Sequence, residues 1–126
     1  MPDMGTARCD FPGGSVSELY SSIQRLYEQL SNDTRVFVGH DYGPGGRPIA
    51  WETTIGEEKK SNKQLKDSTT LEEFSRFRTE RDQTLQVPKL LGPSLQVNLR
   101  NGSFPPAESN GTVYLKIPLN VFGSSS

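Results

Sequence analysis

Two short turns carry the side chains of this chain that are best suited to chemistry. The stretch GTARCDFPGG, residues 5–14, places Cys9 and Asp10 in a glycine-bounded turn, and GHDYGPGG, residues 39–46, holds His40, the only histidine. A neutral imidazole is a common metal ligand and proton carrier, and a carboxylate is a hard oxygen ligand. These residue types indicate a metal or acid–base site formed by Asp10 and His40.

Each of these residues also has an ordinary structural interpretation. His40 follows a predicted strand, and open α/β sheets place ligand sites at strand ends, yet a half-buried histidine bonded to a loop carbonyl fits equally. Asp41 and Tyr42 are placed to orient the imidazole, as metal-bound histidines require. An aspartate such as Asp10 is common in turns, and a free cysteine such as Cys9 often packs as a small apolar group.

The elements that must position these turns follow from hydrophobic spacing and capping signals. Serine or threonine with glutamate three positions later predicts three helices, over residues 15–30, 53–65 and 70–82. The β-branched run at 35–40 predicts a buried strand, and alternating apolar residues predict another within 110–120. Residues 89–109 read as irregular. A helix followed by a strand in this order is typical of an α/β protein.

Charge and composition exclude several functions. The net charge is −1, so no basic surface favours nucleic acid, and the basic residues of the predicted helices, Lys59, Lys60, Arg76, Arg78 and Arg81, read as solvated faces. Apolar runs are far shorter than the roughly 20 residues that cross a bilayer. GPGGRP lacks the lysine and hydroxyl of a phosphate loop. One cysteine excludes an internal disulfide, and a soluble cytoplasmic protein is expected.

The two turns together resemble a known family. MGTARCDFPGG paired with VFVGHDYGPGGRP, followed by TTIGEEKKSN, LQVNLRNG, FPPAESNG and YLKIPLN, resembles the metallo-β-lactamase superfamily. More narrowly it is similar to the persulfide dioxygenase (sulfur dioxygenase) branch, with glyoxalase II as a close relative. The resemblance implies an α/β fold, the C-terminal half of an αββα sandwich, over residues 1–122, with a flexible tail at 123–126.

The resemblance also implies part of a metal site. In the dioxygenases two histidines and one aspartate hold iron(II), and the family's aspartate matches Asp10. His40 matches a histidine that faces the substrate in mononuclear members and binds a second metal in dinuclear ones. Cys9, next to Asp10, would support this site from its side.

On the substrate side, the resemblance implies a pocket for glutathione persulfide. Tyr42 would shape its glutathione end, and Arg47 is a looser match for a group that binds a substrate carboxylate. Asp41 would support both from the same loop.

The chain departs from the family in one respect. It contains no His-x-His-x-Asp-His cluster, so alone it is expected to hold no iron and to be inactive. The resemblance therefore predicts a missing N-terminal half or a second copy as partner. The location is predicted to be cytoplasmic, or mitochondrial if a eukaryotic segment lies upstream. The alternatives are a glyoxalase II-like thioester hydrolase with zinc, or a non-catalytic half-domain that acts through a partner.

Overall fold

The computed structural model describes residues 5–117, and the chain divides into two compact units, Met1–Leu85 and Gln86–Ser126. The predicted tail at 123–126 lies outside the described residues, and the single domain expected over 1–122 stays a prediction. Among the described residues no helix has the length and apolar character needed to cross a membrane.

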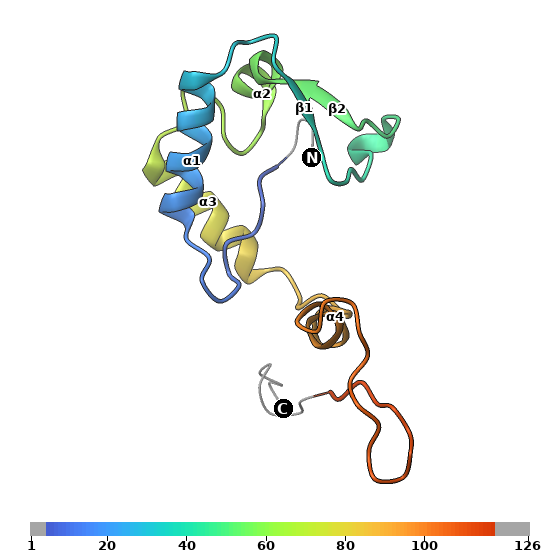
Figure 1. The fold of residues 1–126 in the computed structure, drawn as a ribbon. Coiled ribbons are helices and arrows are strands. Elements are labelled where there is room, and N and C mark those ends of the chain that lie inside the picture. Colours follow the sequence, from blue (N-terminus) through green and yellow to red (C-terminus); the bar gives the residue numbers. More distant parts are fainter. Residues whose placement is uncertain (1–4, 118–126) are drawn as a thin grey trace. The chain divides into compact units, whose positions relative to one another are not determined.

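The first unit is built from three capped helices, α1 (Val16–Gln29), α2 (Ile55–Ser61) and α3 (Leu71–Gln83) (Figure 1). Each begins at a predicted hydroxyl residue whose oxygen accepts a backbone N–H of the first turn; these residues are Ser15, Thr54 and Thr70. The full reciprocal box forms at α3, where the Glu73 carboxylate accepts the Thr70 N–H at 2.9 Å. The three predicted helix starts are therefore confirmed.

The only sheet of the described chain is a two-stranded antiparallel ribbon. β1 (Arg35–Phe37) pairs with β2 (Glu52–Thr54), and a 3-10 turn at Pro44–Gly46 lies in the connection between them. The buried strand predicted over 35–40 is shorter than expected and half-exposed, since the Phe37 side chain is 62% exposed. Helices make up most of the regular secondary structure of the described residues, so the expected α/β character is borne out only by this ribbon.

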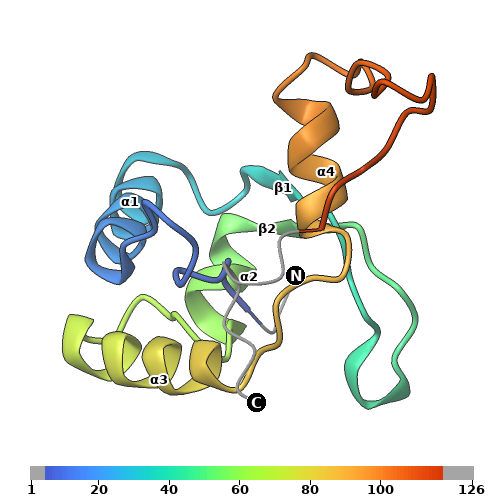
Figure 2. The ribbon, with the colours of Figure 1, turned by 90° about the horizontal axis from the view of Figure 1, so that it is seen from below.

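The core of the first unit lies where α1 packs on α3, with the chain before α1 running alongside α2 and α3 (Figure 2). Phe74 and Leu65 are fully buried, and the Phe74 ring lies 6.0 Å from the ring of Tyr20. Tyr27 is buried and its hydroxyl donates to the Leu65 carbonyl at 2.9 Å. Among the apolar residues of α1, Leu26 remains 45% exposed.

Because of Tyr27, the free energy of unfolding of the first unit is expected to fall at high pH. Burial raises the pKa of Tyr27 to about 12, above the value of about 10 for an unfolded chain. The folded state therefore holds this proton more tightly, and its contribution is complete below about pH 10 and is lost as pH rises toward 12. Tyr27→Phe is expected to remove this pH dependence and about 1 kcal/mol of stability with the hydrogen bond.

Urea denaturation at pH 8 and pH 11 measures both effects. Tyr42→Phe is the matched control, because Tyr42 is 73% exposed. Equal pH dependence in Tyr27→Phe and the unmodified chain would contradict the prediction.

The second unit contains α4 (Leu91–Asn98), within the stretch expected to be irregular. The strand predicted within 110–120 is wrong over its described part, because residues 112–117 have no strand partner. Instead the Gln96 amide pairs with one backbone residue: its nitrogen donates to the Lys116 carbonyl at 2.7 Å, and its oxygen accepts the Lys116 N–H at 2.8 Å. This pairing holds the segment beside α4.

Candidate functional site

The Asp10 turn is closed by backbone contacts and by one ion pair. Gly14 N–H donates to the Phe11 carbonyl at 2.8 Å, and a Cβ on Gly14 would stand 2.3 Å from the Cys9 carbonyl oxygen, so the turn requires glycine there. Both carboxylate oxygens of Asp10 bond to the Arg8 guanidinium, at 2.8 and 2.6 Å. Arg8 thereby lowers the pKa of Asp10. Asp10 is exposed and ionised at neutral pH.

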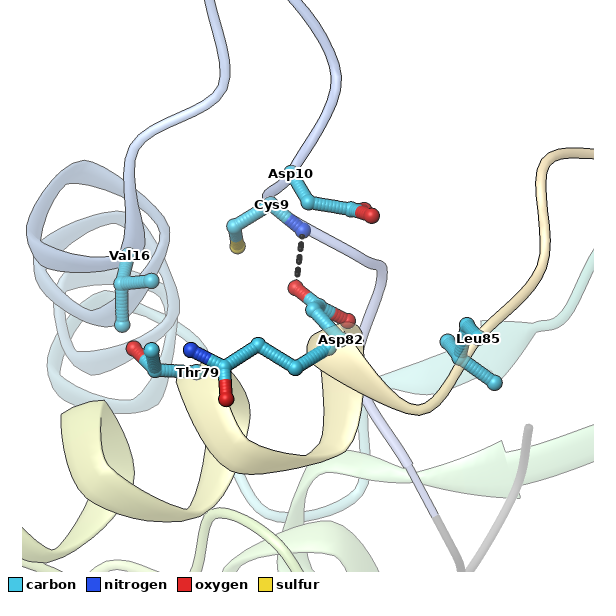
Figure 3. A pocket seen from close by; sticks show the side chains of 7 residues that line it. Cys9, Asp10, Val16, Thr79, Asp82 and Leu85 are labelled. Carbon is cyan, nitrogen blue, oxygen red and sulfur yellow. Dashed lines mark hydrogen bonds between the residues drawn. The ribbon is translucent and has the colours of Figure 1, made fainter. Parts of the chain in front are cut away.

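A cavity of about 440 Å³ opens beside this turn, between it and α3 (Figure 3). Cys9, Asp10, Val16, Thr79 and Asp82 contribute to its lining. The side chains of Cys9 and Asp10 leave the chain in different directions (Figure 3). Burial raises the pKa of the Cys9 thiol, so this thiol is a poor nucleophile at neutral pH.

A buried ion pair on α3 holds the turn from below. The Asp82 carboxylate accepts the Cys9 N–H at 2.8 Å and the Arg78 guanidinium at 2.6 Å (Figure 3 shows the first bond). Arg78 is 3% and Asp82 5% exposed. The prediction that Arg78 lies on a solvated helix face is therefore wrong. Its spacing carried a signal, because Arg78 and Asp82 follow the core residue Phe74 by four and eight positions and share its helix face.

The His40 loop is organised by Asp41. This carboxylate, with 1% of its side chain exposed, accepts two N–H groups of Arg47 at 2.6 and 3.0 Å. It also accepts the backbone N–H groups of Ala50 and Tyr42, each at 2.9 Å. Four bonds on one carboxylate close the loop on itself, and they lower the pKa of Asp41, with Arg47 as the main cause.

His40 lies at the exposed start of this loop. Its ring centroid is 5.2 Å from that of Tyr42, with the planes inclined at 52°. The structure thus brings Tyr42 to His40 and Arg47 to Asp41, while Asp10 belongs with Arg8 and Cys9 with Asp82. Asp10 and His40 stand in different local clusters.

Asp41→Asn is expected to open the loop. The lowered pKa of Asp41 means that its stabilising contribution is present above the ordinary carboxyl pKa and is lost as pH falls through lower values. Asparagine keeps one acceptor oxygen, but it has no charge to hold Arg47 and cannot accept at both positions. The Ala50 amide should therefore exchange with solvent roughly tenfold faster at pH 7. Amide exchange by NMR measures this. Asp33→Asn, a change at an exposed aspartate in another turn, is the control; equal Ala50 rates in all three proteins would contradict the prediction.

The donor atoms of the described residues fit only part of a metal site. Within residues 5–117 no group of three or more His, Cys, Asp or Glu side chains is arranged to hold one. Asp10 suits the carboxylate member of such a set, because it is ionised and borders a cavity, but the described residues do not complete the set. No chemical step is therefore assigned to a metal held by these residues alone.

Comparison with known proteins finds this chain similar to a part of several longer proteins. It is 55% identical over 120 residues to glyoxylase B2 of Dictyostelium discoideum, covering 95% of this chain and 41% of that protein. It is 53% identical over 126 residues to a beta-lactamase hydrolase-like protein of Agrobacterium fabrum, covering all of this chain and 29% of that protein. A probable metallo-hydrolase of Burkholderia pseudomallei is 48% identical over 121 residues, 96% of this chain and 41% of the relative. No protein-family model matches the chain.

The fold has a counterpart among solved structures. ETHE1 from Myxococcus xanthus superposes with a TM-score of 0.65 and 33% identity, over 79% of this chain and 40% of that one. The chain is similar to a part of metallo-β-lactamase-like hydrolases. It spans less than half the length of each of these relatives.

Proposed function

We propose that this chain supplies one wall of a metal-dependent active site, and that the complete protein oxidises glutathione persulfide with oxygen to sulfite and glutathione. The observation that carries this is the Asp10 turn, which presents an ionised carboxylate beside a cavity of about 440 Å³. The similarity to ETHE1 at 33% identity supports the choice of branch.

In this proposal Asp10 is the carboxylate ligand of iron(II), and the histidine ligands come from outside the described residues. The ion pair between Arg8 and Asp10 is compatible with that role, because an ion pair with an exposed carboxylate is weak. A divalent cation can therefore displace Arg8 from Asp10. His40 and Tyr42 would line the substrate side as an aromatic pair. For Arg47 we propose a role in shaping the loop through Asp41 rather than in binding substrate.

A second candidate is a zinc-dependent thioester hydrolase, which the similarity to glyoxylase B2 at 55% identity favours. A dinuclear site of that kind would place His40 on a second metal and Asp10 between two metals. Their separate clusters, Asp10 with Arg8 and His40 with Tyr42, give more support to a mononuclear site.

A non-catalytic half-domain is the third candidate. The ribbon supports it, because Phe37 is 62% and Trp51 69% exposed, and such apolar side chains favour a partner.

One experiment separates the three candidates. The native protein is purified from its source, its iron and zinc are counted, and it is assayed for oxygen consumption with glutathione persulfide and for cleavage of a glutathione thioester. Iron with oxygen consumption is the expected result. Zinc with thioester cleavage would establish the hydrolase, and a metal-free protein inactive in both assays would establish the half-domain.

A further inference from the structure

The Arg78–Asp82 pair lies in an unusual place for two charges. Both side chains are almost fully buried on α3, at 3% and 5% exposure. Burying a charge is costly unless it is paired and hydrogen-bonded. Its partners therefore indicate what the pair holds in place.

The pair is linked to the segment that leads to Asp10, directly at Cys9 and through the Gln64 side chain at Thr6. Asp82 accepts the Cys9 N–H at 2.8 Å. Arg78 donates to the Gln64 side-chain oxygen at 3.0 Å, and the same oxygen accepts the Thr6 N–H at 2.8 Å and the Thr6 hydroxyl at 3.0 Å. One buried network thus binds the backbone at two points, Thr6 and Cys9.

This spacing fixes the chain just before the carboxylate. The Cys9 N–H belongs to the planar peptide unit that ends at the Cys9 Cα, and only the φ and ψ angles of Cys9 separate this unit from the next one, which contains the Asp10 N–H. Fixing the Cys9 amide therefore limits where the Asp10 backbone can lie. The Asp10 carboxylate itself bonds to the Arg8 guanidinium at the surface. The rigid support for this turn comes from α3.

We infer that Arg78 and Asp82 are positioning residues, whose buried ion pair holds the Cys9 amide and thereby sets the place from which Asp10 presents its carboxylate to the cavity. The inference rests on the proposed function in treating Asp10 as a metal ligand. In this inference neither Arg78 nor Asp82 binds the metal or the substrate, and both act through the Cys9 amide. Groups that orient a ligand from behind change metal affinity by about 10–100-fold when they are removed.

The test uses two double variants that differ in one acceptor. Removing Asp82 alone would leave Arg78 buried and uncompensated, so both carry Arg78→Met. The first adds Asp82→Asn, which keeps an oxygen for the Cys9 N–H, and the second adds Asp82→Ala, which has none. Glu80→Ala, an exposed charge loss on the same helix, is the control.

Amide exchange in the full chain is the first readout. In the unmodified protein the Cys9 amide should exchange at least about tenfold more slowly than an unstructured amide. The rate should rise roughly tenfold in the alanine double variant and stay near the original in the asparagine double variant and in Glu80→Ala. Free exchange of the Cys9 amide in the unmodified chain would overturn the inference without any variant.

Iron affinity of the native protein is the second readout, with Asp10→Ala beside the double variants. The alanine double variant should bind iron about tenfold more weakly than the asparagine one, at equal thermal stability. Equal iron affinity in the two, with iron lost in Asp10→Ala, would overturn the inference and leave the proposed function intact. Iron kept in Asp10→Ala would overturn the proposed function, while the exchange result would still decide whether α3 holds the turn.

Discussion

Asp10→Ala is expected to remove iron from the native protein and to lower persulfide-dependent oxygen consumption at least about a hundredfold. The reason is that the carboxylate is the one anionic ligand in a two-histidine, one-carboxylate site, and its loss exceeds the 10–100-fold effect of a group that only orients a ligand. Iron content after dialysis and the initial rate of oxygen uptake measure the two effects.

Two controls accompany this variant. Asp33→Ala removes the same charge from an exposed turn in the same unit and should change neither quantity. Arg8→Gln frees both Asp10 oxygens from their ion pair and should keep or increase iron binding. Loss of iron in Arg8→Gln as large as in Asp10→Ala would show that the turn, and not the carboxylate, is what the site needs.

Phe74→Ala is expected to destabilise the first unit by about 3–5 kcal/mol, because it deletes a fully buried ring and leaves a cavity between α1 and α3. The stability of a whole domain is of order 5–15 kcal/mol, so this single change should unfold much of the unit at 37 °C. Urea denaturation followed by circular dichroism at 25 °C gives the free energy of unfolding.

Phe77→Ala is a matched control for this prediction. It removes the same side chain from the same helix, where Phe77 is 41% exposed, and should cost less than about 1 kcal/mol. A similar loss in both variants would mean that the face of α3 bearing Phe74 is not the packed one.

The helices could be predicted from sequence because their signals are local. Ser15, Thr54 and Thr70 each bond to a backbone N–H only three residues away, so the signal and the structure lie within one turn. The helix α4 was not predicted, because glycine and proline at positions 92 and 93 are typical of a loop. They stand in its first turn, where proline is tolerated because no helical N–H is needed there.

The strands could not be predicted as well, because a strand depends on a partner distant in sequence. β2 is polar, Glu52–Thr54, and it is a strand because it pairs with β1. The alternation at Val113, Leu115 and Ile117 has the right period, but the described residues offer it no partner strand.

The two turns with Asp10 and His40 could be picked out by residue type, whereas their supports could not. The substrate role of Arg47 stays a prediction, whereas its bonds to Asp41, six residues earlier across the GPGG turn, were not predicted. The pair of Arg78 and Asp82 was hidden because charged residues on helices usually face water. Only its register with Phe74 distinguished it.

Gln96 replaces a neighbouring strand with a single side chain. In an extended chain the N–H and C=O of one residue point to the same edge, and those of the next residue point to the opposite edge. By bonding both groups of Lys116, Gln96 selects the edge that faces the helix and leaves Leu115 and Ile117 with their backbone groups turned the other way. A shift of one residue would turn the opposite backbone edge toward α4. The Gln96 amide therefore fixes which backbone groups of residues 115–117 face the helix.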